Sequence, residues 1–349
     1  MIVERNYSIH NVISFKIVTK TGLINRLLSN VDIEYENFKS MQTDEPDFTV
    51  FLGDFSPSNN NSYILDDSYY IRDEHLYCKD SYKIANWKLQ LEGFDQGKIT
   101  AHISHNIFGG MRISLIIDFL IRFVMNEKGY PFIHGSCVSK DDHAYLFPAV
   151  SGGGKTVIAL NLVERGYNFL GDNFTIIHNN RALSFLSPLN IFIYNLSPRI
   201  KRYLGMKNRT ILELKNILYK LTLGYAKIFT KVNVREVFQD QVVDSSGLSA
   251  ICLLIPKEKL QVKRMDKEEL IEHLVVNYKA EANSCLEYTL EYSYMFPQSK
   301  LSRHWDRYRE NLDRNISDSI PTYMVEVPNK YDADTFDRII NIIQNETDS

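Results

Sequence analysis

Short runs of alternating hydrophobic and polar residues fill the first hundred positions and predict strands. The clearest runs are Asp47–Leu52, Tyr69–Arg72 and Trp87–Leu91, and clusters of Gly, Asn, Ser and Asp separate them. The tract Ser56–Ser62 (SPSNNNS) has the composition of a loop. We therefore predict a β-rich accessory region at residues 1–110.

Residues 111–127 carry apolar side chains at the helical period, which predicts a helix that ends at Lys128-Gly129. Asp118 and Arg122 are four residues apart, and we expect them to pair on the solvent-exposed face of this helix. The apolar face that we expect in the core contains Leu115, Phe119, Leu120 and Phe123.

After Pro131 the pattern alternates between strands and helices, as in a βαβ unit with a parallel sheet. The predicted elements in chain order are strands at Phe132–Val138 and Ala144–Val150, a helix at Lys155–Arg165, and strands at Tyr167–Gly171, Phe174–His178, Ala182–Leu186 and Leu248–Ile255. The last ninety residues add helices at Glu268–Tyr278 and Asp332–Gln344 and a strand at Tyr323–Val327. We thus predict an α/β core at 111–256 and a mixed α+β extension at 257–349 that packs on it.

The amino-acid composition and net charge narrow the kinds of protein that this chain can be. Hydrophobic residues make up 44% and charged residues 24%, which is typical of a globular protein with a large core. The formal net charge of −3 does not favour binding to nucleic acid or to a membrane surface. The four cysteines show no CxxC spacing, which fits a reducing compartment and a cytoplasmic location. The most apolar stretch is about 15 residues long and carries charges, so it is too short to span a bilayer.

One segment has a strong excess of basic residues, unlike the nearly neutral chain as a whole. Residues 197–235 contain ten Lys or Arg residues and one acidic residue, Glu213. The apolar spacing over Ile211–Leu223 predicts a helix within this segment. Two interpretations stay open: a solvated helix face, or a docking surface for an acidic peptide or protein. The basic residues are Arg199, Lys201, Arg202, Lys207, Arg209, Lys215, Lys220, Lys227, Lys231 and Arg235.

The strongest local signal is the segment from Ala149 to Thr156, AVSGGGKT. It matches the phosphate-binding loop G-x-x-x-x-G-K-[ST] except that Ala149 replaces the first glycine. An apolar strand precedes it and a helix follows, which is the context that the chemistry needs. Backbone N–H groups of such a loop and of the helix N-terminus surround a phosphate. Residues Ser151, Gly152, Gly153, Gly154, Lys155 and Thr156 form the predicted nucleotide-binding set, with the Lys155 ammonium on the phosphates and the Thr156 hydroxyl on Mg²⁺.

Asp172 follows the predicted strand Tyr167–Gly171 and lies seventeen residues after Lys155. One helix and one returning strand need about that length, so a βαβ crossover would bring Asp172 to the phosphate loop. A carboxylate there can hold Mg²⁺ or accept a proton from an attacking hydroxyl. The alternative is a purely structural role, in which Asp172 is a turn residue in the sequence Gly-Asp-Asn. His134, on the preceding strand, has the same two interpretations: a core histidine, or a residue near the γ-phosphate.

These residues together resemble the HPr kinase/phosphorylase family, and in particular its shorter related proteins, which include kinases of serine on peptides. The likeness covers residues 130–178: the run His134-Gly-Ser-Cys-Val, the run Ala144-Tyr-Leu-Phe-Pro with the loop to Thr156, the run Leu162-Val-Glu-Arg-Gly-Tyr, and the run Leu170-Gly-Asp-Asn. The resemblance implies a fold akin to phosphoenolpyruvate carboxykinase and a serine kinase that uses ATP and Mg²⁺.

The resemblance also assigns roles to single positions. It gives Asp172 the role of proton acceptor from the substrate hydroxyl, Lys155 and Thr156 the phosphate and metal, and His134 the place of the pre-loop histidine. Asn173 stands where the family usually has a second acid. The chain lacks a match to the segment by which HPr kinases engage HPr, so another acceptor is expected.

Three functions are consistent with the sequence. The first is transfer of a γ-phosphoryl group to a serine hydroxyl on a peptide or protein. The second is a small-molecule or sugar kinase on the same scaffold. The third is a nucleotide-binding regulatory module without turnover, which Ala149 and Asn173 would favour. The sequence leaves the oligomeric state open.

Overall fold

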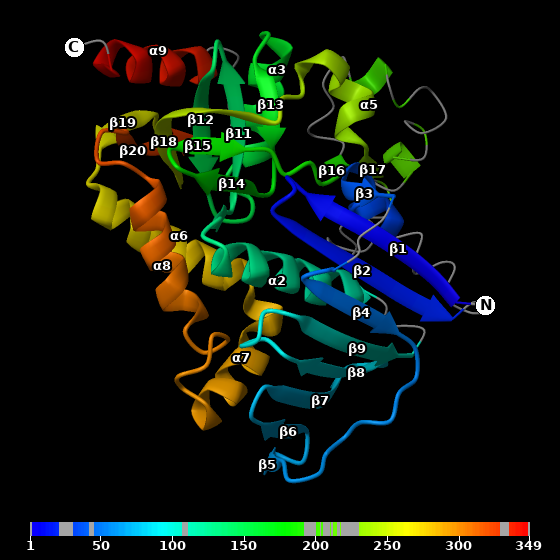
Figure 1. Ribbon diagram of the computed structural model, residues 1–349. Helices are drawn as coiled ribbons and strands as arrows, with labels where there is room; N and C mark the ends of the chain where they lie inside the picture. Colours follow the sequence, from blue (N-terminus) through cyan, green and yellow to red (C-terminus); the bar gives the residue numbers. More distant parts are fainter. Residues whose placement is uncertain are drawn as a thin grey trace. The chain divides into compact units, whose positions relative to one another are not determined.

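The computed structural model describes residues 2–20, 31–41, 45–106, 111–191, 200–202, 204, 210, 212–214, 217, 230–328 and 335–347. The chain forms two compact units, each with its own sheet (Figure 1). Unit 1 comprises Met1–Pro131 and Tyr278–Asn311, and unit 2 comprises Phe132–Asn277 and Leu312–Ser349. The segment 111–131, predicted with the α/β core, is therefore grouped with the β-rich region.

Unit 1 is built on a nine-stranded sheet in the order β3-β1-β2-β4-β9-β8-β7-β6-β5. The strand β2 pairs in parallel with β4, and β4 in parallel with β9, whereas the other neighbours are antiparallel. Its strands are β1 (Ile2–Ile9), β2 (Ile13–Lys20), β3 (Lys39–Ser40), β4 (Phe48–Leu52), β5 (Tyr63–Leu65), β6 (Tyr69–Arg72), β7 (His75–Tyr82), β8 (Ala85–Glu92) and β9 (Ile99–His105).

Helices cover one face of this sheet. They are α2 (Met111–Glu127), which contacts β2, and α7 (Asn283–Met295), which contacts β6, with the short 3₁₀ helix η1 (Glu36–Phe38) just before β3. The unit 1 part of α8 (His304–Asn315) packs on α2 through His304, whose ring lies near Phe119 and Phe123. The indole Nε1 of Trp87 on β8 donates to the hydroxyl of Tyr288 on α7 at 2.9 Å, so this face of β8 points toward α7. Because side chains alternate along a strand, the neighbouring residues Gln90 and Glu92 lie on the opposite face.

Two expectations for α2 are wrong. Arg122 is buried rather than solvated, and its guanidinium lies 5.3 Å from the ring centroid of Tyr278. Asp118 accepts a hydrogen bond from the buried hydroxyl of Tyr35 at 2.5 Å. Leu115, in contrast, is 38% exposed and does not belong to the core. The helix packs against α7 and β2 and so buries more of its surface than a single apolar stripe.

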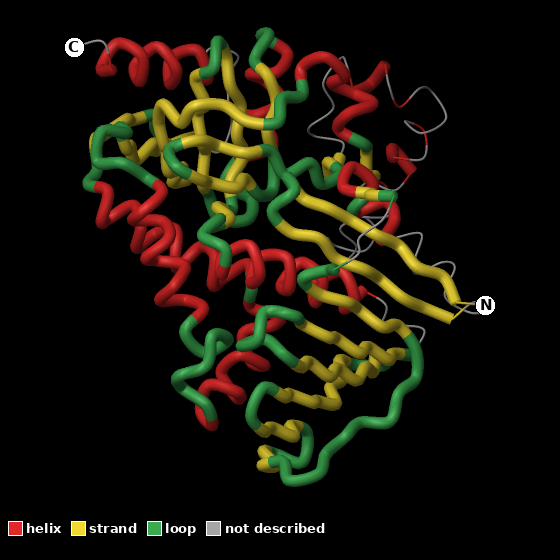
Figure 2. Tube along the Cα trace, viewed as in Figure 1, coloured by secondary structure: helices red, strands yellow, loops and turns green. Residues whose placement is uncertain are grey.

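Unit 2 has a second, mixed sheet in the order β10-β14-β15-β18-β12-β11-β13, with β20 paired to both β18 and β19. Its strands are β10 (Phe132–Ile133), β11 (Gly135–Lys140), β12 (His143–Pro148), β13 (Asn168–Gly171), β14 (Thr175–His178), β15 (Arg181–Leu183), β18 (Ser245–Lys257), β19 (Gln261–Arg264) and β20 (Thr322–Pro328). A separate two-stranded sheet joins β16 (Leu189–Ile191) to β17 (Thr230–Val232). Strands and the other elements are drawn in separate colours in Figure 2.

The strand–helix–strand order of the expected βαβ unit is present, but its two strands are not adjacent in the sheet. The helix α3 (Lys155–Glu164) connects β12 to β13, but these strands are not neighbours. The strand β11 lies between them and is antiparallel to both, so β12 and β13 run in the same direction with one strand separating them. The prediction that β12 and β13 are neighbours in a parallel sheet is therefore wrong, although both strands still end at the same edge.

The other predicted elements of unit 2 lie within one to three residues of their expected ends. The predicted strand Phe132–Val138 is divided at His134 into β10 and β11. The remaining helices are α5 (Val234–Phe238), α6 (Lys267–Glu281) and α9 (Thr335–Thr347), together with the 3₁₀ helix η3 (Gln239–Gln241). The boundary between the units falls inside α6, after Asn277, and inside α8, after Asn311. None of the helices in the described ranges is long and apolar enough to cross a membrane.

Candidate functional site

The glycine-rich segment connects the carboxyl end of β12 to the start of α3. Ala149 directly follows β12, is 1% exposed and has no positive φ. It therefore carries none of the strain that an alanine in the left-handed region would have. Gly152 and Gly154 do adopt positive φ, at 84° and 92°, which glycine tolerates best. The loop accommodates an alanine at the first position because its tight turns lie at the later glycines.

Gly153 has a different reason to be glycine. A Cβ at this position would lie 2.8 Å from the Cβ of Ala149 and 3.1 Å from the carbonyl oxygen of Val150. Its amide donates to that same carbonyl at 3.0 Å, which closes the turn. The alanine at the start of the loop and the glycine four residues later thus fit one another.

The helix α3 starts at Lys155, and its N-cap residue Gly154 makes no side-chain capping hydrogen bond. The first-turn N–H groups of such a helix have no intrahelical partners and attract anions. The side chain of Lys155 is 8% exposed, and its Nζ donates to the carbonyl oxygens of Ala149 at 3.0 Å and Val150 at 3.1 Å. The ammonium therefore lies against the base of the loop.

The structure brings Thr156 and Asp172 together. The Thr156 hydroxyl donates to Oδ2 of Asp172 at 2.9 Å, across the gap between the start of α3 and the end of β13. The other carboxylate oxygen, Oδ1, is buried and has no hydrogen-bond partner. Burial raises the pKa of Asp172 from 3.8 to about 6, while the Thr156 hydrogen bond and the Lys155 charge oppose this increase.

His134 is buried at 3% exposure, next to the base of the loop. Its Nδ1 lies 3.1 Å from Oδ1 of Asn277 on α6. The Asn277 amide nitrogen donates to the carbonyl oxygens of His134 at 3.2 Å and Ala149 at 3.3 Å. The amide nitrogen of Asn277 must face these two carbonyls, so the Oδ1 of Asn277 faces the His134 ring and accepts a hydrogen bond from it. The ring of His134 therefore carries its proton on Nδ1. His134 is therefore buried and linked to the base of the loop through Asn277. This position fits the role of a core histidine better than that of a residue in contact with a γ-phosphate.

Sequence analysis missed two polar residues that hold this arrangement. Asn277 sits among buried apolar residues of α6, and Ser136 lies on β11 and donates from its hydroxyl to the carbonyl of Lys155 at 3.0 Å. Both are buried, with Ser136 at 0% exposure and Asn277 at 6%. A buried polar residue inside an apolar pattern is a usable signal, but it does not reveal which distant group is the partner.

The remaining predicted residues lie nearer to solvent. Ser151 and Asn173 are exposed, as is Gly152. In the basic segment 197–235, Lys201, Arg202, Lys231 and Arg235 are exposed, and Arg235 pairs with Asp244 at 3.5 Å. The predicted helix Ile211–Leu223 and the other basic residues lie largely outside the described residues.

A cation at the loop would find few protein ligands. The described residues contain no group of three or more His, Cys, Asp or Glu side chains able to hold a metal ion. Thr156 and Asp172 could supply two oxygen ligands, which suits Mg²⁺, because this ion keeps several waters and shares its coordination with substrate phosphates. The unpartnered Oδ1 shows that the buried Asp172 carboxylate still has acceptor capacity toward a ligand.

Comparison with known proteins adds little. No protein-family model matches the sequence, and no curated protein matches it. Among solved structures, the HPr(Ser) kinase/phosphatase from Coxiella burnetii is similar at 14% identity, over 44% of this chain and 98% of that one, with a TM-score of 0.24. A TM-score this low does not establish a shared fold. The chain is thus a mixed α/β protein whose function has to be inferred from its own residues.

Proposed function

We propose that this protein is an ATP-dependent phosphotransferase that moves the γ-phosphoryl group to a hydroxyl, with serine on a peptide or protein as the acceptor. The observation that carries the proposal is the Thr156–Asp172 hydrogen bond of 2.9 Å at the N-terminus of α3. It joins an anion-binding helix end, a hydroxyl and a carboxylate, which are the parts that phosphoryl transfer requires.

Each of these residues has a distinct task in the proposal. The N–H groups of the Gly152–Lys155 loop and the first turn of α3 bind phosphate oxygens. Lys155 exchanges its hydrogen bonds to the Ala149 and Val150 carbonyls for phosphate oxygens. Thr156 and Asp172 hold Mg²⁺, which when bound neutralises charge on the phosphates.

Asp172 is also the proposed proton acceptor. Its raised pKa of about 6 keeps it ionised at neutral pH yet makes it a stronger base than an ordinary aspartate. Its Oδ1 makes no hydrogen bond within the protein and is the oxygen that would receive the proton from the substrate hydroxyl. The hydrogen bond from Thr156 holds this carboxylate in place for the step.

The acceptor is proposed to be acidic. The exposed cations Lys201, Arg202, Lys231 and Arg235 belong to the basic segment 197–235, most of which lies between the paired strands β16 and β17. An acidic peptide would complement this charge and gain in association rate.

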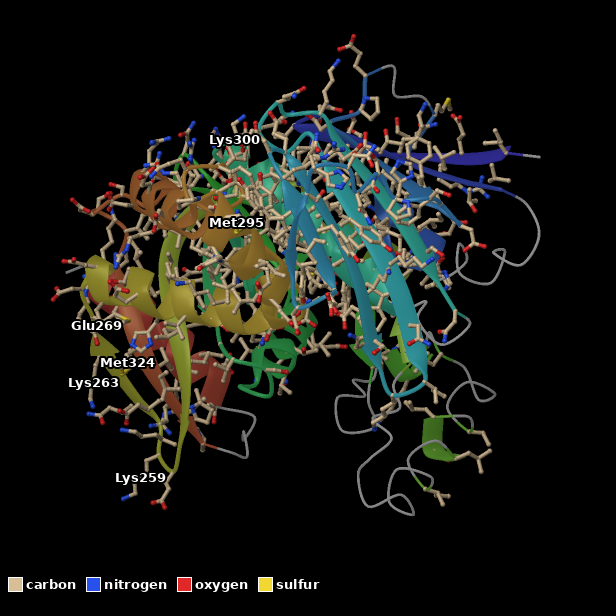
Figure 3. All side chains as sticks on the ribbon, turned by 90° about the horizontal axis from the view of Figure 1, so that it is seen from below. Lys259, Lys263, Glu269, Met295, Lys300 and Met324 are labelled. Atoms are coloured by element: carbon tan, nitrogen blue, oxygen red, sulfur yellow. The ribbon has the colours of Figure 1, made fainter. Side chains whose placement is uncertain are left out.

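The first test is calorimetric titration with ATP, with and without Mg²⁺. We expect binding by the wild type and a loss of about 100-fold in affinity for Lys155→Ala, because a charge-assisted contact to phosphate disappears. The matched control is Lys259→Ala, since this exposed lysine projects from the turn between β18 and β19 (Figure 3). No binding at millimolar ATP, or equal binding by both variants, would contradict the proposal.

The second test measures phosphate transfer to serine-containing peptides. We expect Asp172→Asn to bind ATP but to lose about 10²–10⁴-fold in turnover, the range typical of a lost general base. Turnover equal to that of the wild type would remove Asp172 from the proposed chemistry.

A further inference from the structure

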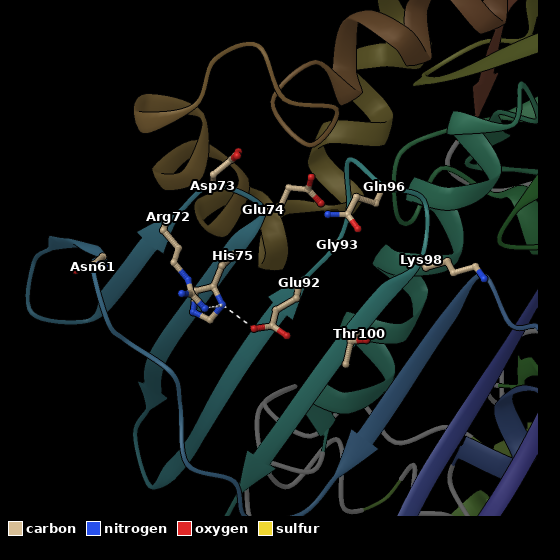
Figure 4. Close-up of a pocket in the computed structure, with 10 residues that line it drawn as sticks. All are labelled: Asn61, Arg72, Asp73, Glu74, His75, Glu92, Gly93, Gln96, Lys98 and Thr100. Atoms are coloured by element: carbon tan, nitrogen blue, oxygen red, sulfur yellow. Dashed lines mark hydrogen bonds and ion pairs between the residues drawn. The ribbon is translucent and has the colours of Figure 1, made fainter.

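Unit 1 has a polar basin at one end of its sheet, on the face opposite α7 (Figure 4). The cavity has a volume of about 620 Å³. Residues from the end of β6, the start of β7, the end of β8 and the start of β9 line it, among them Arg72, Glu74, His75, Glu92, Lys98 and Thr100. None of these residues takes part in the phosphate-loop site, which lies in unit 2.

His75 is the buried centre of the basin. Its side chain is 3% exposed, and its Nδ1 lies 2.9 Å from Oε1 of Glu92 on the neighbouring strand. Two groups compete for Nδ1: the Glu92 carboxylate, which only accepts, at 2.9 Å, and Nη2 of Arg72, which only donates, at 3.5 Å. The shorter contact places the ring proton on Nδ1, facing Glu92. The other nitrogen, Nε2, is buried without a partner and presents a lone pair. Burial lowers the pKa of His75 below 6.5, which keeps the ring neutral at pH 7.

Two further buried acceptors lie in the same region. Oε2 of Glu74, which lines the basin, has no hydrogen-bond partner. Neither does Oε1 of Gln90, which lies two residues before Glu92 on the same face of the sheet but is not one of the lining residues. The Gln90 amide nitrogen donates to Glu92 at 3.2 Å, which identifies its unpartnered atom as the carbonyl oxygen. The three unpartnered atoms of His75, Glu74 and Gln90 are all acceptors, and buried acceptors are normally satisfied by a donor.

The charges around the basin favour a cation. Carboxylates of Asp73, Glu74 and Glu92 outnumber the cations of Arg72 and Lys98. Lys98 is already paired with Glu45 at 3.3 Å, which reduces its availability to an anion. An anion in the basin would also face the Nε2 lone pair of His75, with no proton there to bind it.

We propose that this basin binds a primary ammonium group. Such a group carries a positive charge and N–H donors, which matches the unpartnered acceptors of His75 and Glu74, both of which line the basin, and the excess of carboxylates. The ammonium can belong to a free small amine or to a lysine side chain of a bound polypeptide, and these two sources share the same recognition.

The test is ligand-observed NMR and calorimetry on the full chain with three probes: spermidine, Nα-acetyl-lysine methylamide and the uncharged Nα-acetyl-norleucine methylamide. We expect one or both amines to bind with a dissociation constant of about 1 mM or lower, and the norleucine probe not to bind. Preference for spermidine would identify a small-amine site, and preference for the lysine derivative a polypeptide site.

Glu74→Gln is the main variant and should weaken amine binding by about tenfold or more, because it replaces a charged acceptor with an amide. The matched control is Asp66→Asn in the neighbouring β5–β6 turn, since Asp66 and Glu74 are both turn carboxylates with φ near 50°, at 49° and 51°. A second variant, Glu92→Gln, tests the same acceptor set, and thermal melting confirms that each variant folds.

Three results would overturn the proposal. They are no amine binding at about 10 mM, equal loss in Asp66→Asn, and preferential binding of inorganic phosphate that depends on Arg72. ATP binding by the same preparations reports on the phosphate loop independently, so failure here would leave the proposed kinase function intact.

Discussion

The phosphate-loop site of unit 2 and the polar basin of unit 1 both contain buried ionisable groups, but they satisfy them differently. At the loop, Lys155 donates to two main-chain carbonyls and Thr156 to Asp172, so the polar groups are held by one another and by the backbone. In the basin, Nδ1 of His75 lies near both Glu92 and Arg72, and its second ring nitrogen, Nε2, has no partner.

This difference shows how the two units place polar groups. The loop lies in a single stretch of chain between a strand and a helix, and the backbone itself supplies most of the hydrogen bonds. The basin depends on pairing between strands, and its side chains meet because register places them opposite one another, as with His75 and Glu92. Each site leaves a buried acceptor without a partner, Oδ1 of Asp172 at the loop and Nε2 of His75 in the basin, but only the loop holds its other polar groups mainly through the backbone.

The largest expected contrast between the units concerns two buried asparagines. Asn277→Ala removes the donor to the Ala149 and His134 carbonyls, and Asn311→Ala removes the donor to Asn126 in unit 1. Both should destabilise the protein by about 1–3 kcal/mol for each buried acceptor left unsatisfied. Only Asn277→Ala should also weaken ATP binding, by about tenfold, because it alone supports the loop.

Urea denaturation and ATP titration of the two variants test this contrast. Equal ATP affinity in Asn277→Ala and the wild type would mean that α6 does not position the loop. An equal loss in both variants would mean that the loss reflects general destabilisation.

A somewhat smaller effect is expected in the pH dependence of stability, with opposite signs for Asp172 and His75. The raised pKa of Asp172, about 6 against 3.8, means that the folded state keeps the proton to higher pH than the unfolded chain. Wild-type stability is therefore lost as pH rises through 6, by up to about 3 kcal/mol relative to Asp172→Asn. The lowered pKa of His75 has the reverse effect, because the unfolded chain is protonated first as pH falls below 6.5.

Denaturation of Asp172→Asn and His75→Gln at pH 4, 6 and 8 measures both trends. The stability of Asp172→Asn relative to the wild type should increase from pH 4 to pH 8. That of His75→Gln should increase from pH 8 to pH 4. Identical trends would show that burial does not set these pKa values.

The smallest expected effect tests the fit within the loop. Gly153→Ala should cost about 1–3 kcal/mol of stability, because its Cβ would come within 2.8 Å of the Ala149 Cβ. Ala149→Gly removes that contact and by itself should cost no more than about 1 kcal/mol. In the double variant the loss should be smaller than the sum of the two single losses, and strict additivity would mean that these two residues do not compete for space.

The sequence predicted the approach of Asp172 to the glycine-rich loop, whereas nothing in it predicted the basin. The loop, the helix after it and the approach of Asp172 follow from one contiguous segment, and the hydrogen bond to Thr156 shows that approach. The mixed order of the sheet was not predictable, because β11 inserts between β12 and β13 through pairing that hydrophobic alternation does not encode. Arg122 was misplaced for a similar reason, since its burial depends on Tyr278, far along the chain.

By itself, the sequence determined where helices and strands lie and where a phosphate could bind, because periodicity and loop composition are local properties of the chain. Only the tertiary structure decided which strands pair, that Asn277 joins α6 to the base of the loop, and that the Asp172 carboxylate is buried enough to raise its pKa to about 6. It also decided that His75, Glu74 and Gln90 share one region of the sheet. Hydrogen-bond partners, burial and the resulting pKa values depend on register and packing between distant segments, and these are properties of the folded chain.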